Sequence, residues 1–304
     1  MKVPAFVLFI ISLCFAFYGC NFKNNEKPAL NTPSVQQTDR GHDDGHRDAS
    51  GSKKQANPKD RSTSRRLLLP KIADNSSVVY LGKSVDPITK KTVEGIAFIC
   101  YEKGFGKTNK TEKQVHKESS KCYAFLVEGI KWKSTENYIF DPTNNRGLNH
   151  ATLRSLLANS TKEWNKQAEA DIFGVEVDGE VDNVDALVPN GKNEVYFAAI
   201  SIDKVIAMTM VWRISEGLIE QRRITEWDMV FNQKDYDWST EAKGVSGKMD
   251  FHNIAMHEVG HAAGMGHPDD DCVDETMYGH ANWAETKKRD LNAGDIAGIR
   301  DLYK

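Results

Sequence analysis

The chain has 304 residues, of which 39% are hydrophobic and 9% aromatic, and this is enough for one sizeable folded domain with accessory segments. Its 40 basic and 43 acidic side chains give a net charge of −3. A near-balanced chain provides no strong basic field of the kind that attracts nucleic acid or anionic membranes, so we expect no nucleic-acid partner.

Residues 1–19 have the pattern of a signal peptide. Lys2 precedes an apolar run over residues 3–17 that is too short to span a bilayer comfortably. The run ends at Gly19 and Cys20, and a small residue before a cysteine resembles the lipobox of bacterial lipoproteins. The two aromatic residues before Gly19 are bulkier than that pattern prefers, so nearby cleavage with an unmodified Cys20 is the alternative. We expect an extracytoplasmic protein, either a cell-surface lipoprotein held to the membrane through Cys20 or a secreted protein.

Two further segments precede the main body of the chain. Residues 20–66 are polar, charged and poor in large apolar side chains, which predicts a disordered tether behind the lipid-anchor cysteine. Residues 67–128 are rich in strand-forming runs, at 78–81, 96–101 and 122–127. We expect a small sheet or hairpin there.

From residue 129 the chain alternates between strand and helix patterns. The expected strands are residues 137–140, 195–200, 205–212 and 224–232, and the expected helices are residues 149–170, 250–263 and a last one that begins near residue 292. The runs at 195–200 and 205–212 are continuously apolar, as in a sheet that is covered on both faces. Residues 224–232 alternate, which predicts an edge strand with one solvated face.

A metal-binding pattern occupies residues 257–267. His257 and His261 are four residues apart, so on a helix both imidazoles project from one face and can share a metal ion, with Glu258 beside them. Gly264 can end the helix in a left-handed turn, which brings His267 back as a third ligand. Three protein ligands leave one tetrahedral position open, as in catalytic zinc sites. A helix with two surface histidines and a glycine-rich cap is the alternative that this spacing disfavours.

With Met277 ten residues further on, the chain resembles the metzincin zinc metallopeptidases, and among them the matrixin-like group of secreted microbial peptidases. The blocks that carry the resemblance are residues 131–133, 144–148, 226–232, 257–267, 276–279 and 294–303. The resemblance implies an α+β metzincin catalytic domain over residues 129–304, with a twisted, mainly parallel sheet, an antiparallel edge strand and three helices. Pro268 stands where matrixins usually have Ser.

The resemblance also implies a function and a set of roles. It implies a zinc-dependent endopeptidase that hydrolyses peptide bonds in protein or peptide substrates with a metal-activated water. His257, His261 and His267 would hold one catalytic zinc ion, Glu258 would be the general base, and Met277 would form the Met-turn below the metal. Substrate would bind along the edge strand at Glu226, Asp228 and Val230, and Tyr278 and His280 would line the pocket beyond the cut.

The sequence leaves two features undecided, the disulfide pairing and the role of an acidic loop. Cys100, Cys122 and Cys272 allow one disulfide, either Cys100–Cys122 or Cys122–Cys272, with one thiol left over. The acidic loop at residues 269–275 could bind Ca²⁺, and a solvated acidic loop is the preferred alternative because EF-hand spacing is absent.

Two other functions are compatible with the motif. One is a catalytically silent surface binding or adhesion protein on a metzincin scaffold, against which the intact Glu258 argues. The other is a zinc-dependent hydrolase of non-peptide substrates, which would need a closed pocket in place of an open cleft.

Overall fold

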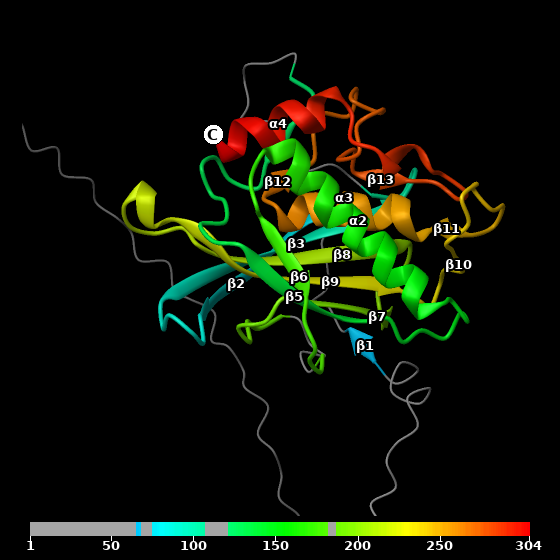
Figure 1. Ribbon diagram of the computed structural model, residues 1–304, viewed down its shortest axis with the longest axis horizontal. Helices are drawn as coiled ribbons and strands as arrows, with labels where there is room; N and C mark the ends of the chain where they lie inside the picture. The colour runs from blue at the N-terminus through cyan, green and yellow to red at the C-terminus, as the bar shows by residue number, and fades with distance from the viewer. Residues whose placement is uncertain (1–64, 68–74, 107–120, 182–186) are drawn as a thin grey trace, which may run out of the picture. The chain divides into compact units, whose positions relative to one another are not determined.

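A mixed β-sheet with helices on one side forms the framework of the computed structural model (Figure 1), which describes residues 65–67, 75–106, 121–181 and 187–304. The elements are β1 (Arg66–Leu67), β2 (Val78–Val85), β3 (Thr92–Glu102), β4 (Ala124–Phe125), β5 (Glu136–Asp141), α2 (His150–Ala168), β6 (Phe173–Glu176), β7 (Glu194–Ile200), β8 (Val205–Ile214), η3 (Ile219–Gln221), β9 (Arg223–Asn232), β10 (Trp238–Ser239), β11 (Met249–Asp250), α3 (Phe251–Ala262), β12 (Met265–Gly266), β13 (His280–Ala281), η4 (Lys287–Arg289) and α4 (Ala293–Tyr303). The predicted signal peptide, Cys20 and the tether up to residue 64 lie outside the described residues.

The main sheet has nine strands in the order β13-β3-β8-β9-β7-β5-β6, with β2 paired to β3 and β1 paired to β7. Strands β6, β5, β7 and β9 are parallel, whereas β8 is antiparallel to β9. Strand β3 is antiparallel to β8, and β2 is antiparallel to β3. The predicted α+β class is therefore confirmed, with a mixed sheet and, among the described residues, three α-helices.

The predicted edge strand is wrong. Residues 224–232 do form a strand, β9, but it lies inside the sheet between β7 and β8. The antiparallel strand β8 is not an edge either, because β3 pairs with its other side. The alternation in β9 arises because its two faces bury different groups: Trp227 and Met229 face one core, while Glu226 and Asp228 are buried on the other face.

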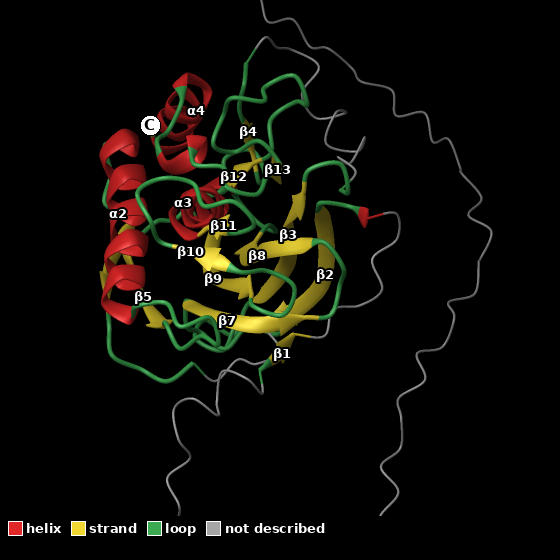
Figure 2. Ribbon diagram, turned by 90° about the vertical axis from the view of Figure 1, so that its right-hand side faces the viewer, coloured by secondary structure: helices red, strands yellow, loops and turns green. Residues whose placement is uncertain are grey.

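Three helices cover one face of the sheet (Figure 2). A polar side chain caps the start of each of them. The side chain of Asn149 accepts a hydrogen bond from the first turn of α2, and Asp250 does the same for α3. Helix α4 starts with a capping box between Asn292 and Asp295. The helix boundaries expected near residues 149, 250 and 292 are thus confirmed.

Residues alternate along the strands between two cores. The larger core lies between the sheet and the helices and includes Trp164, Trp227 and Phe251. The smaller core, on the opposite face, takes Ala97 and Ile99 of β3 together with neighbours from β7 and β8. Strand β3 therefore belongs to the same folded unit as β8, although even their closest paired residues, Tyr101 and Val205, are 104 positions apart in the chain.

The disulfide joins Cys122 to Cys272, and Cys100 is free and buried. Of the two pairings that the sequence left open, the longer one is therefore present. It fastens the segment that carries β4, which pairs with β12, to the loop that follows α3. In the part of the chain that the structure describes, no helix is both long and apolar enough to cross a membrane.

Candidate active site

Three histidine side chains meet beside α3. His257 and His261 lie one turn apart on this helix, so their imidazoles share a face. The helix ends at Ala262, and Gly264 then adopts a φ of 104°, a conformation that residues with a side chain resist. This turn reverses the chain through β12 and places His267 opposite the helix.

The geometry of the three rings fits a zinc ion. Their Nε2 atoms are 3.2 Å apart for His257 and His261, 3.0 Å for His261 and His267, and 3.4 Å for His267 and His257. Nitrogen ligands of a tetrahedral zinc ion, each about 2.0–2.1 Å from the metal, lie about 3.4 Å from one another. The other ring nitrogens of His257 and His261 lie 2.6 Å from the carbonyl oxygen of Thr276 and 2.9 Å from that of Met265. Donation of Nδ1–H to these carbonyls leaves the Nε2 lone pairs free for a metal.

Burial also keeps these imidazoles neutral. The side chains of His257 and His261 are fully buried, and that of His267 is 3% exposed. Desolvation lowers the pKa of His257 and His267 well below its usual value, and lowers the pKa of His261 to about 3. Neutral imidazole is the form that binds a metal ion, so the donor set and its protonation state agree.

Glu258 is directed by a threonine on the sheet. The hydroxyl of Thr209, on β8, donates to Glu258 Oε2 at 2.6 Å. The other carboxylate oxygen, Oε1, is buried and has no hydrogen-bond partner among the described residues. Burial raises the pKa of Glu258 to about 8, while the Thr209 hydrogen bond and the charge of Lys288 act in the opposite direction. One oxygen is thus held and the other is available to a proton.

An acidic side chain of α4 stabilises the turn at Met277. The carboxylate of Asp295, on α4, accepts hydrogen bonds from the backbone N–H groups of Thr276 at 2.7 Å and Met277 at 3.0 Å. Met277 is fully buried and packs against α3 at Gly260, where an added Cβ would lie 2.2 Å from the methionine sulfur. Burial, together with the charge of Glu275, raises the pKa of Asp295 to about 6 against the effect of these donors.

Residues 203–304, which include all three histidines, Glu258 and Met277, match the matrixin family of M10 peptidases. This chain is matrixin-like. No curated protein matches it. The matrixin-like region covers β8, β9, α3 and α4, so the family resemblance and the histidine cluster coincide in the same part of the fold.

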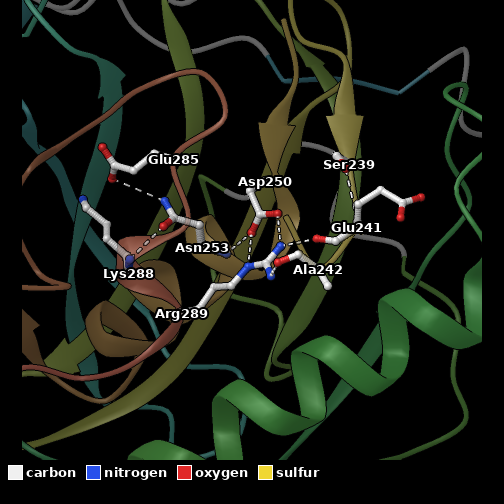
Figure 3. Close-up of polar contacts among 8 residues, drawn as sticks. All are labelled: Ser239, Glu241, Ala242, Asp250, Asn253, Glu285, Lys288 and Arg289. Carbon is white, nitrogen blue, oxygen red and sulfur yellow. Dashed lines mark hydrogen bonds and ion pairs between the residues drawn. The ribbon is translucent and has the colours of Figure 1, made fainter. Parts of the chain in front are cut away.

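The first turn of α3 in the matrixin-like region is held by η4 and by the loop that contains Ala242, as Figure 3 shows. Arg289 donates to Asp250 Oδ1 at 2.8 Å and to the carbonyl oxygen of Ala242 at 2.7 Å, and Asp250 is the cap of the helix. Asn253 accepts from the backbone N–H of Lys288 at 2.8 Å. Lys288 is itself buried, and its ammonium group donates to the carbonyl oxygen of Tyr278. The start of the helix and the segment after Met277 are therefore held together.

Three predicted substrate-binding residues lie away from the histidines. Glu226, Asp228 and Val230 are buried on the central strand β9. Glu226 accepts from the backbone N–H of Gly191 at 2.6 Å, and Asp228 accepts from that of Glu194 at 3.0 Å. Val230 packs in the smaller core. These positions contradict the prediction that the three residues contact an extended substrate.

Tyr278 and His280 follow Met277 directly. Their rings lie 5.5 Å apart, and His280 is part of β13, which pairs with the end of β3. Gly279, between them, approaches His267 so closely that an added Cβ would lie 3.3 Å from its ring. Their place beside His267 fits the wall of a pocket, and that role stays a prediction.

Two groups of three side chains among the described residues could hold a metal ion. One is the histidine cluster, and the other is Cys100 with His257 and Glu258, whose ligand atoms lie within 4.8 Å of one another. Neither group includes an acid of the loop at residues 269–275 that could have bound Ca²⁺. Sequence reasoning identified the histidines from their spacing but did not foresee that Cys100 lies next to them.

Proposed function

We propose that the chain is a zinc-dependent endopeptidase that cleaves internal peptide bonds of proteins. The observation that carries the proposal is the convergence of the three Nε2 atoms, 3.0–3.4 Å apart, beside Glu258 within the region that matches the matrixins. We further propose that residues 129–304 form a catalytic domain of the metzincin type, in which Met277 lies under the metal.

A bound zinc ion would polarise the scissile carbonyl group and lower the pKa of a water molecule. His257, His261 and His267 would hold it through Nε2. Glu258 would accept a proton from the water at Oε1 and later pass it to the leaving nitrogen, because that oxygen has no other partner among the described residues. Thr209 would keep Oε2 in place while the proton moves.

An extracytoplasmic location is part of the proposal. A disulfide between Cys122 and Cys272 supports an oxidising compartment, as does the signal-peptide pattern over residues 1–19. We propose that Cys20 carries the lipid anchor and that the substrates are proteins or peptides outside the cytoplasm. Phase separation in a detergent extract would place a lipidated mature protein in the detergent phase, and a Cys20→Ala variant in the aqueous phase.

The test of the function is cleavage of a denatured protein by the zinc-loaded chain, beside the variant Glu258→Gln. Cleavage should stop when a zinc chelator is added and resume when zinc is restored. Glu258→Gln should bind one equivalent of zinc and lose at least about 99.9% of the turnover, since the glutamine amide cannot accept the proton. Measurable turnover by this variant, equal to that of a chain with Glu258 in place under the same conditions, would contradict the mechanism.

The silent binding protein makes a different prediction in the same assay. It would bind zinc through the three histidines but leave the denatured protein intact under every condition, including in variants whose histidines are exposed to the substrate.

A further inference from the structure

Strand β3 occupies the side of β8 that would otherwise be the edge of the sheet next to the histidines. The two strands pair antiparallel at eight positions, from Glu94 opposite Arg213 to Tyr101 opposite Val205. The opposite side of β8 is paired with β9. Strand β8 therefore has no free backbone edge along its contact with β3.

The side chains of β3 also cover the histidine cluster. The ring of Phe98 stacks on that of His261, with centroids 4.1 Å apart and planes inclined by 9°, and meets His267 edge-on at 5.9 Å. Two residues along the strand, Cys100 places its sulfur within 4.8 Å of ligand atoms of His257 and Glu258. Both β3 side chains point to the same face of the sheet because strand side chains alternate.

The result is a site from which solvent is excluded. Glu258, His257 and His261 have no exposed surface, and Phe98, which lies over the rings, is 1% exposed. A peptide can be cut only if its scissile carbonyl group reaches the histidine nitrogens and Glu258. An extended peptide that binds beside a sheet also needs an unpaired strand edge for its main-chain hydrogen bonds. Strand β3 fills both the space and the edge.

Strand β3 is held in this position by its neighbours. Strand β2 pairs along its outer side, and β13 pairs with its end at Tyr101. Gly95 allows close packing, because an added Cβ there would lie 2.6 Å from the ring of Trp212. Glu94 adds an ion pair with Arg213, at 3.5 Å, across the two strands. The contact is therefore part of the folded state and not an accidental touch of a loose segment.

We propose that residues 92–102 are an internal inhibitory strand, which lies where an extended peptide would bind and keeps the chain inactive until β3 separates from β8. This inference rests on the proposed peptidase function. It implies that Phe98 is the side chain that closes the site and that strand separation, with zinc already bound, starts the activity.

The test compares Phe98→Ala with the wild type in the full, zinc-loaded chain. Loss of the ring removes the contact with His261 and weakens the hold of β3. Cleavage of a denatured protein should become at least tenfold faster, and the amides of residues 92–102 should exchange hydrogen faster in the same sample. Ile88→Ala, in the exposed turn between β2 and β3, is the matched control and should behave like the wild type.

A reversible cross-link between the strands supplies the second arm. Ala97 lies opposite Met210, and both side chains point into the smaller core, away from the histidines. We would add Ala97→Cys and Met210→Cys to the Phe98→Ala variant. Oxidation of this pair should return the cleavage rate to the wild-type level, and reduction should restore the faster rate of Phe98→Ala. Phe98→Ala treated with the same reductant controls for loss of the Cys122–Cys272 disulfide.

Several outcomes would overturn the inference while leaving the peptidase function intact. Wild-type cleavage as fast as that of Phe98→Ala is one, and equal rates for the oxidised and reduced cross-link variants are another. A third is a Cys100→Ser variant that cleaves the substrate as fast as Phe98→Ala while the amides of residues 92–102 remain protected from hydrogen exchange. In that case the Cys100 thiol, and not the strand, would inhibit the site. By contrast, zinc-loaded Phe98→Ala that loses protection over residues 92–102 and still cuts nothing would overturn the proposed peptidase function itself.

Discussion

Thr209 illustrates how one hydroxyl on the sheet can determine the use of a carboxylate on a helix. It holds Glu258 Oε2 at 2.6 Å and leaves Oε1 without a partner among the described residues. Thr209→Val keeps the shape and removes the hydrogen bond. We expect kcat to fall about 10- to 100-fold, which corresponds to the loss of a hydrogen bond to a charged group, with zinc stoichiometry unchanged.

The control for this prediction is Thr225→Val. Thr225 lies on the neighbouring strand β9 and donates to the carbonyl oxygen of Trp212, away from Glu258. Steady-state cleavage rates of the two variants, each in the Phe98→Ala background, would separate them. Equal losses in both would mean that Thr209 acts through general packing.

The buried carboxyl group of Glu226 should make the free energy of unfolding depend on pH. Glu226 is buried, and its carboxyl group accepts from the backbone N–H groups of Asn190 at 2.9 Å and Gly191 at 2.6 Å. Burial raises the pKa of Glu226 to about 7, above the usual value of 4.5. The folded state then binds the proton more tightly than the unfolded state, so this contribution is complete below about pH 4.5 and is lost as the pH rises through 7.

Glu226→Gln should therefore reduce the fall in unfolding free energy between pH 5 and pH 8 by about 1–3 kcal/mol. Urea denaturation at the two pH values would measure it, with Glu220→Gln on the exposed turn η3 as the control. An unchanged pH dependence would show that the two backbone donors offset the burial completely.

At the scale of residues, spacing alone predicted that the three histidines and Glu258 would come together. His257, Glu258 and His261 fall on one helix face, and Gly264 supplies the turn that returns His267, so local geometry determines all four. The partners Thr209 and Asp295 were missed because they lie 49 residues before Glu258 and 18 residues after Met277. A hydroxyl or a carboxylate has no local pattern that shows which distant backbone or side chain it will contact.

At the scale of elements, the turn at Met277 depends on helix α4. The carboxylate of Asp295 binds the backbone of Thr276, whose carbonyl oxygen in turn contacts Nδ1 of His257. Asp295→Asn replaces one of the two accepting oxygens by a donor and should disturb this chain of contacts. We expect zinc affinity to fall about 10- to 100-fold, as is usual when a group that orients a ligand is lost.

Competition with a chromophoric chelator would measure this affinity without any assay of cleavage. Asp301→Asn, on the exposed side of the same helix, is the control and should keep the wild-type affinity. Unchanged zinc binding in Asp295→Asn would mean that the Met277 turn holds its shape without the acid.

The strands and helices themselves were largely predictable from the sequence, whereas the pairing partners of the strands were not. Apolar runs and capping residues located β7, β8, α2, α3 and α4 because these signals are local. The predicted place of β9 was wrong because its buried acids were taken for a solvated face, whereas backbone amides at the start of β7 and in the loop before it satisfy them. The pairing of β3 with β8 joins residues more than 100 positions apart, and no local pattern encodes it.

At the scale of the whole molecule, the disulfide links segments 150 residues apart in sequence. Cross-links that close long loops restrict the unfolded chain, and removal of this one by Cys122→Ala with Cys272→Ala should lower the unfolding free energy by about 2–4 kcal/mol. Thermal unfolding monitored by circular dichroism would show the loss. Equal stability of the variant and the wild type would mean that the paired strands β4 and β12 hold the two segments unaided.

The buried free thiol of Cys100 bears on which disulfide forms as the chain folds. A bond between Cys100 and Cys122 would close a loop of about 20 residues, and short loops close more readily than one of 150. Burial raises the pKa of Cys100 far above its usual value, so little reactive thiolate forms once β3 is in place. We therefore expect the Cys122–Cys272 bond to form more efficiently once β3 has docked on β8, because the strand that covers the histidines then also withholds the Cys100 thiol from the wrong cross-link.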